Sequence, residues 1–261
     1  MSVITSFQAN LAISYIEQLQ SHKPLVHCMT NDVVQNFTAN VLLAIGATPA
    51  MVLAKEEVID FVTIADSLLI NIGTISASSV DSMLLAAETA MKTHTPWVLD
   101  PVAVGSVLAY RTNINQTLLS FRPTVIRGNA SEILALVGEK SSSKGPDSLD
   151  STEVALHWAR ELALQYQTVV AVTGAIDYIT DGKTVYSIIG GDIALTRVTG
   201  TGCSLSAMVA AFIGCTSDTL LATSSACFMM KKAGQLANKH SGLGSFAVSL
   251  LDQLSLFITQ Y

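Results

Sequence analysis

The sequence predicts one α/β domain built in three layers: a mainly parallel β-sheet covered by helices, with an antiparallel hairpin at its edge. Two observations predict this fold. Short apolar runs that stop at turn-forming residues alternate along the chain with stretches of helical spacing. Two further strand-like runs flank an Asp-Gly dipeptide, which suits a tight hairpin turn. No linker signal divides the 261 residues, so we expect a single domain over residues 1–261.

The first part of the chain predicts a helix and no export signal. Met1 to Asn10 lacks a basic start followed by an apolar core, and Leu11 to Leu19 has the spacing of a short amphipathic helix. Every apolar run ends well before the roughly 18 to 20 residues that a membrane span requires. We therefore expect a cytoplasmic protein that does not enter a membrane.

Four apolar runs are predicted as parallel strands because they are short, apolar and bounded by Gly, Asp, Asn or Pro. Helical spacing between them predicts the covering helices. In such sheets ligands bind beyond the carboxyl ends of the strands, so Asp100, Arg127, Asn129 and Thr173 become site candidates. The strands are Ala65 to Ile72, Pro96 to Leu99, Thr124 to Ile126 and Thr168 to Val172, and the helices are Ser78 to Thr93, Ser151 to Gln165 and a central Ser204 to Ile213.

The later part of the chain carries the hairpin and one polar loop. Tyr178 to Ile188 contains two strand-like runs around Asp181 and Gly182, so an antiparallel edge should follow the parallel part. Glu139 to Asp150 is polar and Ser-rich with a Gly-Pro, which predicts a mobile surface loop.

The composition favours a small-molecule partner and copies of the same chain. Half of the residues are hydrophobic and only 13% are charged, so much apolar surface must be hidden inside or between subunits. A net charge of −6 without clusters of Lys and Arg gives no reason to expect nucleic acid. Four cysteines without CxxC pairing support neither a metal cluster nor a disulfide framework.

A glycine turn before the central helix is the strongest local signal. In Val198 to Cys203, Gly200 and Gly202 let the backbone turn so that several N–H groups face one point at a helix start, an arrangement that binds anions. The alternative is a glycine loop that merely begins a buried helix. The sequence contains neither a Gly-x4-Gly-Lys-[Ser/Thr] loop nor a strand-coupled Gly-x-Gly-x-x-Gly, so another phosphate-binding scheme is needed.

Five segments together resemble the hydroxyethylthiazole kinase family of the ribokinase-like superfamily. The resemblance covers nearly the whole chain in order, and it implies phosphorylation of 4-methyl-5-(2-hydroxyethyl)thiazole with ATP and magnesium, which salvages the thiazole half of thiamine. The segments are Pro24-Leu-Val-His-Cys-Met-Thr-Asn-Asp32, Leu99-Asp-Pro-Val-Ala-Val-Gly105, Arg127-Gly-Asn-Ala-Ser-Glu132, Val172-Thr-Gly174 and Gly200-Thr-Gly-Cys203.

The resemblance implies a role for each matched position in the phosphoryl transfer. Gly200, Thr201 and Gly202 form the anion hole, and Cys203 stands where most ribokinase-like enzymes carry the Asp that accepts the hydroxyl proton. A thiol at a helix N-terminus should have a lowered pKa, which favours a thiolate base; the alternative is a small packing residue.

The two matched carboxylates are expected to hold magnesium. Asp100 ends a strand and Glu132 lies in an Asn-x-x-Glu pattern, and Mg²⁺ needs few direct protein oxygens. The alternatives are a turn residue before Pro101 for Asp100 and a helix-start carboxylate paired with Asn129 or Ser131 for Glu132.

The resemblance also divides the remaining positions between the two substrates. Arg127 and Thr173 are implied to contact ATP, although a Thr that bonds its own strand is an alternative for Thr173. Asn31, Val33, Met51 and the backbone of Gly200 are implied to bind the thiazole. An amide can hydrogen-bond a ring nitrogen, and Met offers an adaptable apolar wall, although core filling is the alternative for Met51. The family places this site between the subunits of a homotrimer.

Two other functions remain open at the level of sequence. An ATP-dependent lyase, such as a dehydratase of hydrated nicotinamide nucleotides, is similar in sheet plan and glycine turn, but it resembles this chain less near Asn31 and normally has Asp at position 203. A binding or regulatory protein that lost catalysis is the second alternative. Retention of Asp100, Arg127 and Glu132 argues against that loss.

Overall fold

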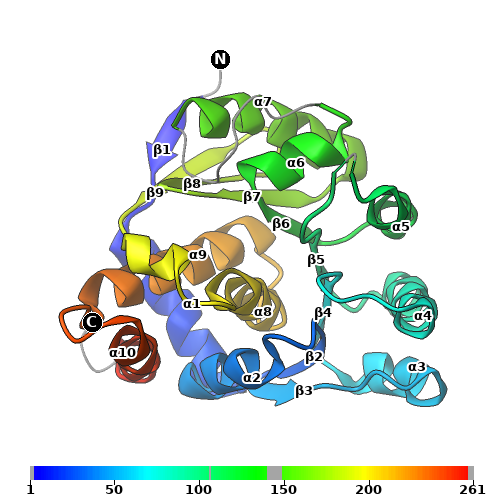
Figure 1. The fold of residues 1–261 in the computed structure, drawn as a ribbon, viewed down its shortest axis with the longest axis horizontal. Helices are drawn as coiled ribbons and strands as arrows, with labels where there is room; N and C mark the ends of the chain where they lie inside the picture. The colour runs from blue at the N-terminus through cyan, green and yellow to red at the C-terminus, as the bar shows by residue number, and fades with distance from the viewer. Residues whose placement is uncertain (1–2, 106, 140–148, 258–261) are drawn as a thin grey trace.

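The computed structural model describes residues 3–105, 107–139 and 149–257, which form a continuous sheet between two layers of helices (Figure 1). The strands are β1 (Ile4–Ser6), β2 (Leu25–Met29), β3 (Thr48–Ala50), β4 (Ser67–Asn71), β5 (Trp97–Asp100), β6 (Val125–Asn129), β7 (Val169–Thr173), β8 (Ile176–Thr180) and β9 (Val185–Ile189). The helices are α1 (Ala9–His22), α2 (Gln35–Ala44), α3 (Lys55–Ile64), α4 (Ala77–Thr93), α5 (Ala109–Ser120), α6 (Ala130–Leu136), α7 (Leu149–Tyr166), the 3₁₀ turn η1 (Ile193–Thr196), α8 (Thr201–Ile213), α9 (Thr219–Leu236) and α10 (Leu243–Ser255).

The strands pair in the order β1-β9-β8-β7-β6-β5-β4-β2-β3. Every pairing is parallel except the two made by β8, which runs antiparallel to β7 and to β9. The hairpin predicted around Asp181 and Gly182 is therefore confirmed. The strand β1 pairs beyond β9 and forms the outer edge of this side of the sheet.

Alternation of side chains along the strands gives the sheet two apolar faces. Within β4, Leu68 and Ile70 belong to one buried cluster, whereas Leu69 belongs to the other. Successive side chains of a strand point to opposite faces, so a strand covered on both sides is apolar throughout. This explains why the central strands appear in the sequence as continuous apolar runs.

The helices divide between the two faces as the apolar clusters do. Helices α3, α4, α5, α6 and α7 line one side of the sheet, and α1, α2, α8, α9 and α10 line the other (Figure 1). Helix α8 contacts β2, β4 and β5 on its inner side and α9 and α2 on its outer side, and most of its residues are buried. The prediction of a central helix at Ser204 to Ile213 is confirmed.

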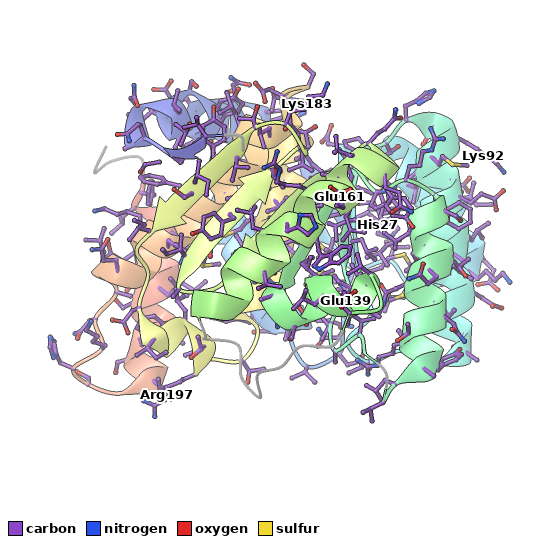
Figure 2. The ribbon with its side chains drawn as sticks, turned by 90° about the horizontal axis from the view of Figure 1, so that it is seen from above. His27, Lys92, Glu139, Glu161, Lys183 and Arg197 are labelled. Carbon is purple, nitrogen blue, oxygen red and sulfur yellow. The ribbon has the colours of Figure 1, made fainter. Side chains whose placement is uncertain are left out.

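Lys92, Lys183 and Arg197 are charged side chains that lie at the periphery (Figure 2). Among the described residues, no helix is long and apolar enough to cross a membrane. The polar loop expected at Glu139 to Asp150 falls mostly on residues 140–148, which lie outside the described part of the chain.

Candidate active site

A cavity of about 650 Å³ lies at the carboxyl ends of the central strands. Its wall combines the ends of β5, β6 and β7 with the loop after β9 and the first turn of α8. The structure brings together eight of the residues expected in the site, since all of them line this cavity: Asp100, Arg127, Glu132, Thr173, Gly200, Thr201, Gly202 and Cys203. Asn129, the remaining strand-end candidate, lines it as well.

The glycine turn opens α8 toward the cavity. Gly200 caps the helix with a φ of 97°, a left-handed conformation that suits glycine. The carbonyl of Gly200 accepts the N–H of Ser204 at 2.8 Å, which closes the first helical turn. The N–H groups of Thr201, Gly202 and Cys203 then have no acceptor within the helix. Together with the helix dipole, these free donors favour an anion at this point.

Arg127 adds a fixed positive charge to the same point. A Cβ placed on Gly202 would lie only 3.1 Å from a terminal nitrogen of Arg127, so a larger residue there would require the guanidinium to shift by a few tenths of an ångström. Arg127 donates to the hydroxyl of Thr173 at 2.5 Å, and that hydroxyl is 3.4 Å from the carbonyl of Gly128. This contact runs to the neighbouring strand β6 and not to the strand of Thr173 itself, and Thr173 also fixes the guanidinium.

Asp100 is buried beneath the cavity wall, with 1% of its surface exposed. Its Oδ2 accepts hydrogen bonds from Asn71 at 2.7 Å and from Ser206 at 2.8 Å, whereas its Oδ1 has no partner among the described residues. Burial raises the pKa of Asp100 to about 7, because desolvation and the nearby Glu132 outweigh the attraction of Arg127. A carboxylate so short of partners would be stabilised in its charged form by a cation in the cavity.

Glu132 is engaged by backbone donors at the start of α6. Its Oε2 accepts from the N–H of Asn129 at 2.9 Å, and the side chain of Asn129 accepts from the N–H of Glu132, which completes a capping box. Its Oε1 accepts from the N–H of Ala103 at 3.1 Å. The pairing with Asn129 that the sequence left open is therefore present. Carboxylate oxygens retain further lone pairs, so it does not prevent a contact with a cation or its waters.

The expectation of a low pKa for Cys203 is wrong in sign. Burial raises the pKa of the Cys203 thiol to about 11, and the negative charge of Asp100 acts in the same direction. The nearby amides of Asn71 and Asn31 and the charge of Arg127 lower it by less. Desolvation is the largest cause of this shift, and with a pKa of about 11 the thiol is protonated at neutral pH.

Of the four residues expected to bind the alcohol, Gly200 lines this cavity, whereas Asn31, Val33 and Met51 are absent from its wall. The amide of Asn31 approaches the sulfur of Cys203 at 3.5 Å, so the segment after β2 contacts the glycine turn directly. Val33 is 69% exposed, and Met51 is half-buried against the apolar cluster below. Within the described residues, the side chain of Val33 is therefore exposed to solvent.

Sequence reasoning missed two groups of residues that hold the cavity in shape. Asn71 and Ser206 bind Asp100, and no sequence motif marked them. Lys231 is buried on α9 and lies 3.2 Å from Asp177; its ammonium also donates to carbonyls of both cavity-lining loops. The three carbonyls are those of Gly174, Ala175 and Gly190, at 2.8, 3.0 and 3.3 Å. A lysine inside an apolar helical stretch was the one available signal, since buried lysines are rare unless paired.

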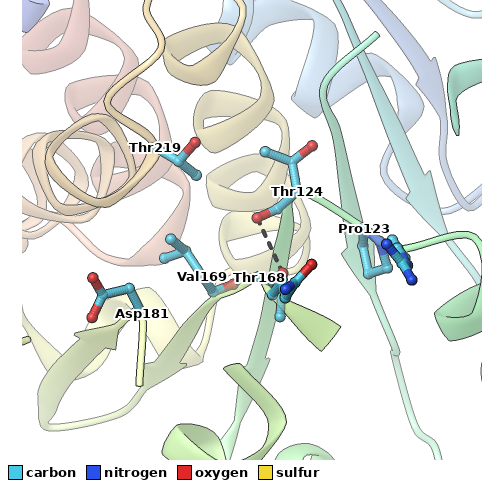
Figure 3. A pocket seen from close by; sticks show the side chains of 8 residues that line it. Pro123, Thr124, Thr168, Val169, Asp181 and Thr219 are labelled. Atoms are coloured by element: carbon cyan, nitrogen blue, oxygen red, sulfur yellow. Dashed lines mark hydrogen bonds between the residues drawn. The ribbon is translucent and has the colours of Figure 1, made fainter. Parts of the chain in front are cut away.

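A second cavity of about 360 Å³ lies at the opposite, amino ends of β6 and β7 (Figure 3). Thr124, Thr168, Asp181 and Thr219 line it, and the hydroxyl of Thr168 donates to the carbonyl of Thr124 at 3.1 Å. Asp181 is the one carboxylate among the described residues that line this second cavity. The residues expected in the site line the first cavity, at the carboxyl ends of the strands.

The sheet order, the two helical layers and the glycine turn define a ribokinase-like α/β protein. A solved ribokinase-like superfamily protein from Enterococcus faecalis superposes with a TM-score of 0.68 over 99% of this chain and 96% of its own, at 14% identity. At this identity the likeness shows a shared fold.

The chain belongs to the hydroxyethylthiazole kinase family, whose sequence profile matches residues 16–260. It is 52% identical over 249 residues to the hydroxyethylthiazole kinase of Yersinia enterocolitica, which covers 95% of each chain. The solved hydroxyethylthiazole kinase protein of Pyrococcus horikoshii superposes with a TM-score of 0.86 at 38% identity, over 94% of this chain and 93% of the other.

Proposed function

We propose that this protein transfers the γ-phosphoryl group of ATP to the primary hydroxyl of 4-methyl-5-(2-hydroxyethyl)thiazole, a step of thiamine salvage in the cytoplasm. One observation carries the proposal: the free N–H groups at the start of α8 line the same cavity as Arg127 and Asp100. Phosphoryl transfer depends mainly on positioning and on stabilising charge, and these groups supply both. Membership of the family supports the choice of alcohol and disfavours the lyase alternative.

The nucleotide is proposed to bind at the charged side of the cavity. Arg127 can hold phosphate oxygens in a two-pronged contact, because its guanidinium stays charged and is fixed by Thr173. The anion turn of Gly200, Thr201 and Gly202 would then receive the charge that develops on the transferred group.

Magnesium fits the carboxylates of this site. Asp100 contributes a buried, unpartnered oxygen, and Glu132 lies close enough to raise the pKa of Asp100. Mg²⁺ keeps most of its water in proteins, so two carboxylates suffice beside the ATP phosphates. When bound there, Mg²⁺ would neutralise charge on the phosphates.

The acceptor alcohol is proposed to bind between Asn31, Val33, Met51 and the backbone of Gly200. The contact between Asn31 and Cys203 supports this, because it sets the alcohol segment against the glycine turn. With a pKa of about 11, Cys203 would act as a neutral neighbour of the reacting hydroxyl. The hydroxyl proton would then leave without a thiolate base, which a loose transition state permits.

A homotrimer with the alcohol site between subunits is part of the proposal. The exposure of Val33 supports it, since an apolar side chain beside the site would be covered by a second copy. Sedimentation or light scattering of the purified protein tests this, and a monomer at assay concentration would contradict it.

The decisive experiment is product formation by the purified protein with ATP, Mg²⁺ and hydroxyethylthiazole. A panel of other small alcohols and a reaction without alcohol serve as controls. We expect the thiazole phosphate to form selectively. Phosphate on no alcohol would overturn the proposal and favour the lyase or a binding protein, which assays with hydrated nicotinamide nucleotides and with ligand titration would separate.

A further inference from the structure

Asn71, the last residue of β4, connects the two sides of the site. It is fully buried, and its side chain makes three hydrogen bonds. Its Nδ2 donates to Oδ2 of Asp100 at 2.7 Å, and its Oδ1 accepts from the N–H of Gly73 and from Nδ2 of Asn31, both at 3.0 Å. The side chain of Asn71 therefore hydrogen-bonds both to Asp100, which is proposed to hold the cation, and to Asn31, which is proposed to bind the alcohol.

The orientation of the Asn71 amide follows from its partners. When ionised, a carboxylate can only accept, so the nitrogen of Asn71 must face Asp100. A backbone N–H can only donate, so the oxygen of Asn71 must face Gly73. Both requirements give the same orientation of the amide.

The orientation of Asn31 follows in turn. Facing the oxygen of Asn71, Asn31 must present its Nδ2, and the same nitrogen lies 3.5 Å from Sγ of Cys203. Both of its amide protons are thereby engaged. Its Oδ1 has no hydrogen-bond partner among the described residues and, unlike Oδ1 of Asp100, is not sealed from solvent. The carbonyl oxygen of Asn31 is what this amide can offer a ligand.

We propose that Asn71 is a positioning residue that transmits the orientation of Asp100 to Asn31, so that Asn31 accepts a hydrogen bond from the hydroxyl of the acceptor alcohol. This inference rests on the proposed function. A ring nitrogen without a proton does not suit an amide oxygen, so the hydroxyl takes the place that the sequence suggested for the ring nitrogen. The orientation that Asp100 and the N–H of Gly73 impose on Asn71 therefore reaches the ligand through two amides.

The test replaces Asn71 by Ala and measures the Michaelis constants for both substrates. Without the relay, Asn31 can rotate and leave the hydroxyl unpaired, so we expect the KM for the alcohol to rise about tenfold and kcat to fall. The KM for ATP should stay within about twofold, because Arg127 and Thr173 do not bond to Asn71 and because Asp100 keeps its hydrogen bond from Ser206. A general loosening of the fold would change both KM values.

Asn115→Ala is the matched control. Asn115 is equally buried, but it donates to the backbone of Arg111 within α5 and does not line the cavity. We expect this variant to lose thermal stability and to keep both KM values. If it shows the same rise in the KM for the alcohol alone, the relay through Asn71 is wrong.

A binding experiment gives a second readout without turnover. In calorimetry, the unsubstituted protein should bind hydroxyethylthiazole more tightly than 5-ethyl-4-methylthiazole, which lacks the hydroxyl, and Asn71→Ala should reduce that difference. Asn71→Ser, which keeps a small polar group beside Asp100, is the substitute if the Ala variant does not fold. An undiminished difference in the folded variant overturns the relay.

The assay of the unsubstituted protein separates the two proposals. If it forms no thiazole phosphate, the proposed function has failed. If it forms the phosphate but Asn71→Ala keeps an unchanged KM for the alcohol, the relay alone has failed.

Discussion

The charged side of the site and its alcohol side are built differently. On the charged side, Asp100, Arg127, Glu132 and Thr173 are each fixed by hydrogen bonds within the chain. On the alcohol side, Val33 is exposed and Met51 is half-buried, outside the wall of the main cavity. The comparison teaches that one chain completes the part that must hold charge rigidly. In the proposed trimer, a second subunit would complete the part that is proposed to select the alcohol.

The largest expected effect breaks the charged side. Asp100→Asn should lower kcat about 10³-fold, because it removes the negative charge proposed to hold the cation. The fold should persist, since Asn can keep the hydrogen bonds from Asn71 and Ser206 through its amide oxygen. Steady-state kinetics and thermal unfolding measure both, and Glu132→Gln should act in the same direction. Undiminished kcat in either variant would remove the magnesium assignment.

The next effect concerns the loops that line the charged side. Lys231→Met leaves Asp177 charged and buried without its partner, which should lower the free energy of unfolding by about 3 kcal/mol. The loops at Gly174 and Gly190 lose their common donor, so the KM for ATP should rise about tenfold while that for the alcohol stays constant.

Two variants control this prediction. Lys55→Met removes a pair with Asp81 that is exposed on both sides, and it should change neither stability nor kinetics measurably. The double change Lys231→Met with Asp177→Asn should recover part of the melting temperature, because the buried charge is gone. Equal KM values in wild type and Lys231→Met would show that the pair serves stability alone.

A smaller effect sharpens the alcohol side. Val33→Glu should raise the KM for the alcohol about tenfold, because a charge would be buried where a second subunit is proposed to cover Val33. The KM for ATP should remain unchanged, and light scattering should detect a smaller assembly. Ile64→Glu is the control, since Ile64 is similarly exposed at the end of α3. Identical behaviour of the two variants would contradict a subunit contact at Val33.

The smallest effect lies where the two sides meet. Because the Cys203 thiol is protonated at neutral pH, Cys203→Ala should lower kcat less than about tenfold, below the range for a lost general base. With a raised pKa of about 11, the thiolate fraction increases about tenfold for each pH unit up to that value. Alkylation of Cys203 by iodoacetamide should therefore keep accelerating between pH 8 and pH 10. A plateau near pH 8 would restore the thiolate base.

Much of the sheet could be predicted from the sequence, because buried strands require apolar runs and turns require particular residues. The strands that became β4 to β9 all carry such a signature. The strands β1 and β3 do not, since each has three residues and owes its pairing to a distant partner. In strand β2 the buried His27 interrupts the apolar run, so the sequence does not mark this segment as a buried strand.

The cavity residues at strand ends and in the glycine turn were predictable for a related reason, since strand direction and helix starts are local properties. Asn71 was not, because its importance comes from partners at positions 31, 73 and 100. The prediction of a low pKa for Cys203 was wrong for the opposite reason. Its helix start is visible in the sequence, but its burial is not.

The strand β1 has a consequence for how the chain folds. It pairs in parallel with β9, so Ile4 lies beside Val185, from the far part of the sequence. Contacts between such distant residues form late, because closing a long loop is slow. Until β1 docks, the apolar edge of β9 is open to pairing with another chain. We therefore expect β1 to be the last strand to join the sheet and to cover the edge of β9. Refolding at low protein concentration should limit aggregation through this edge.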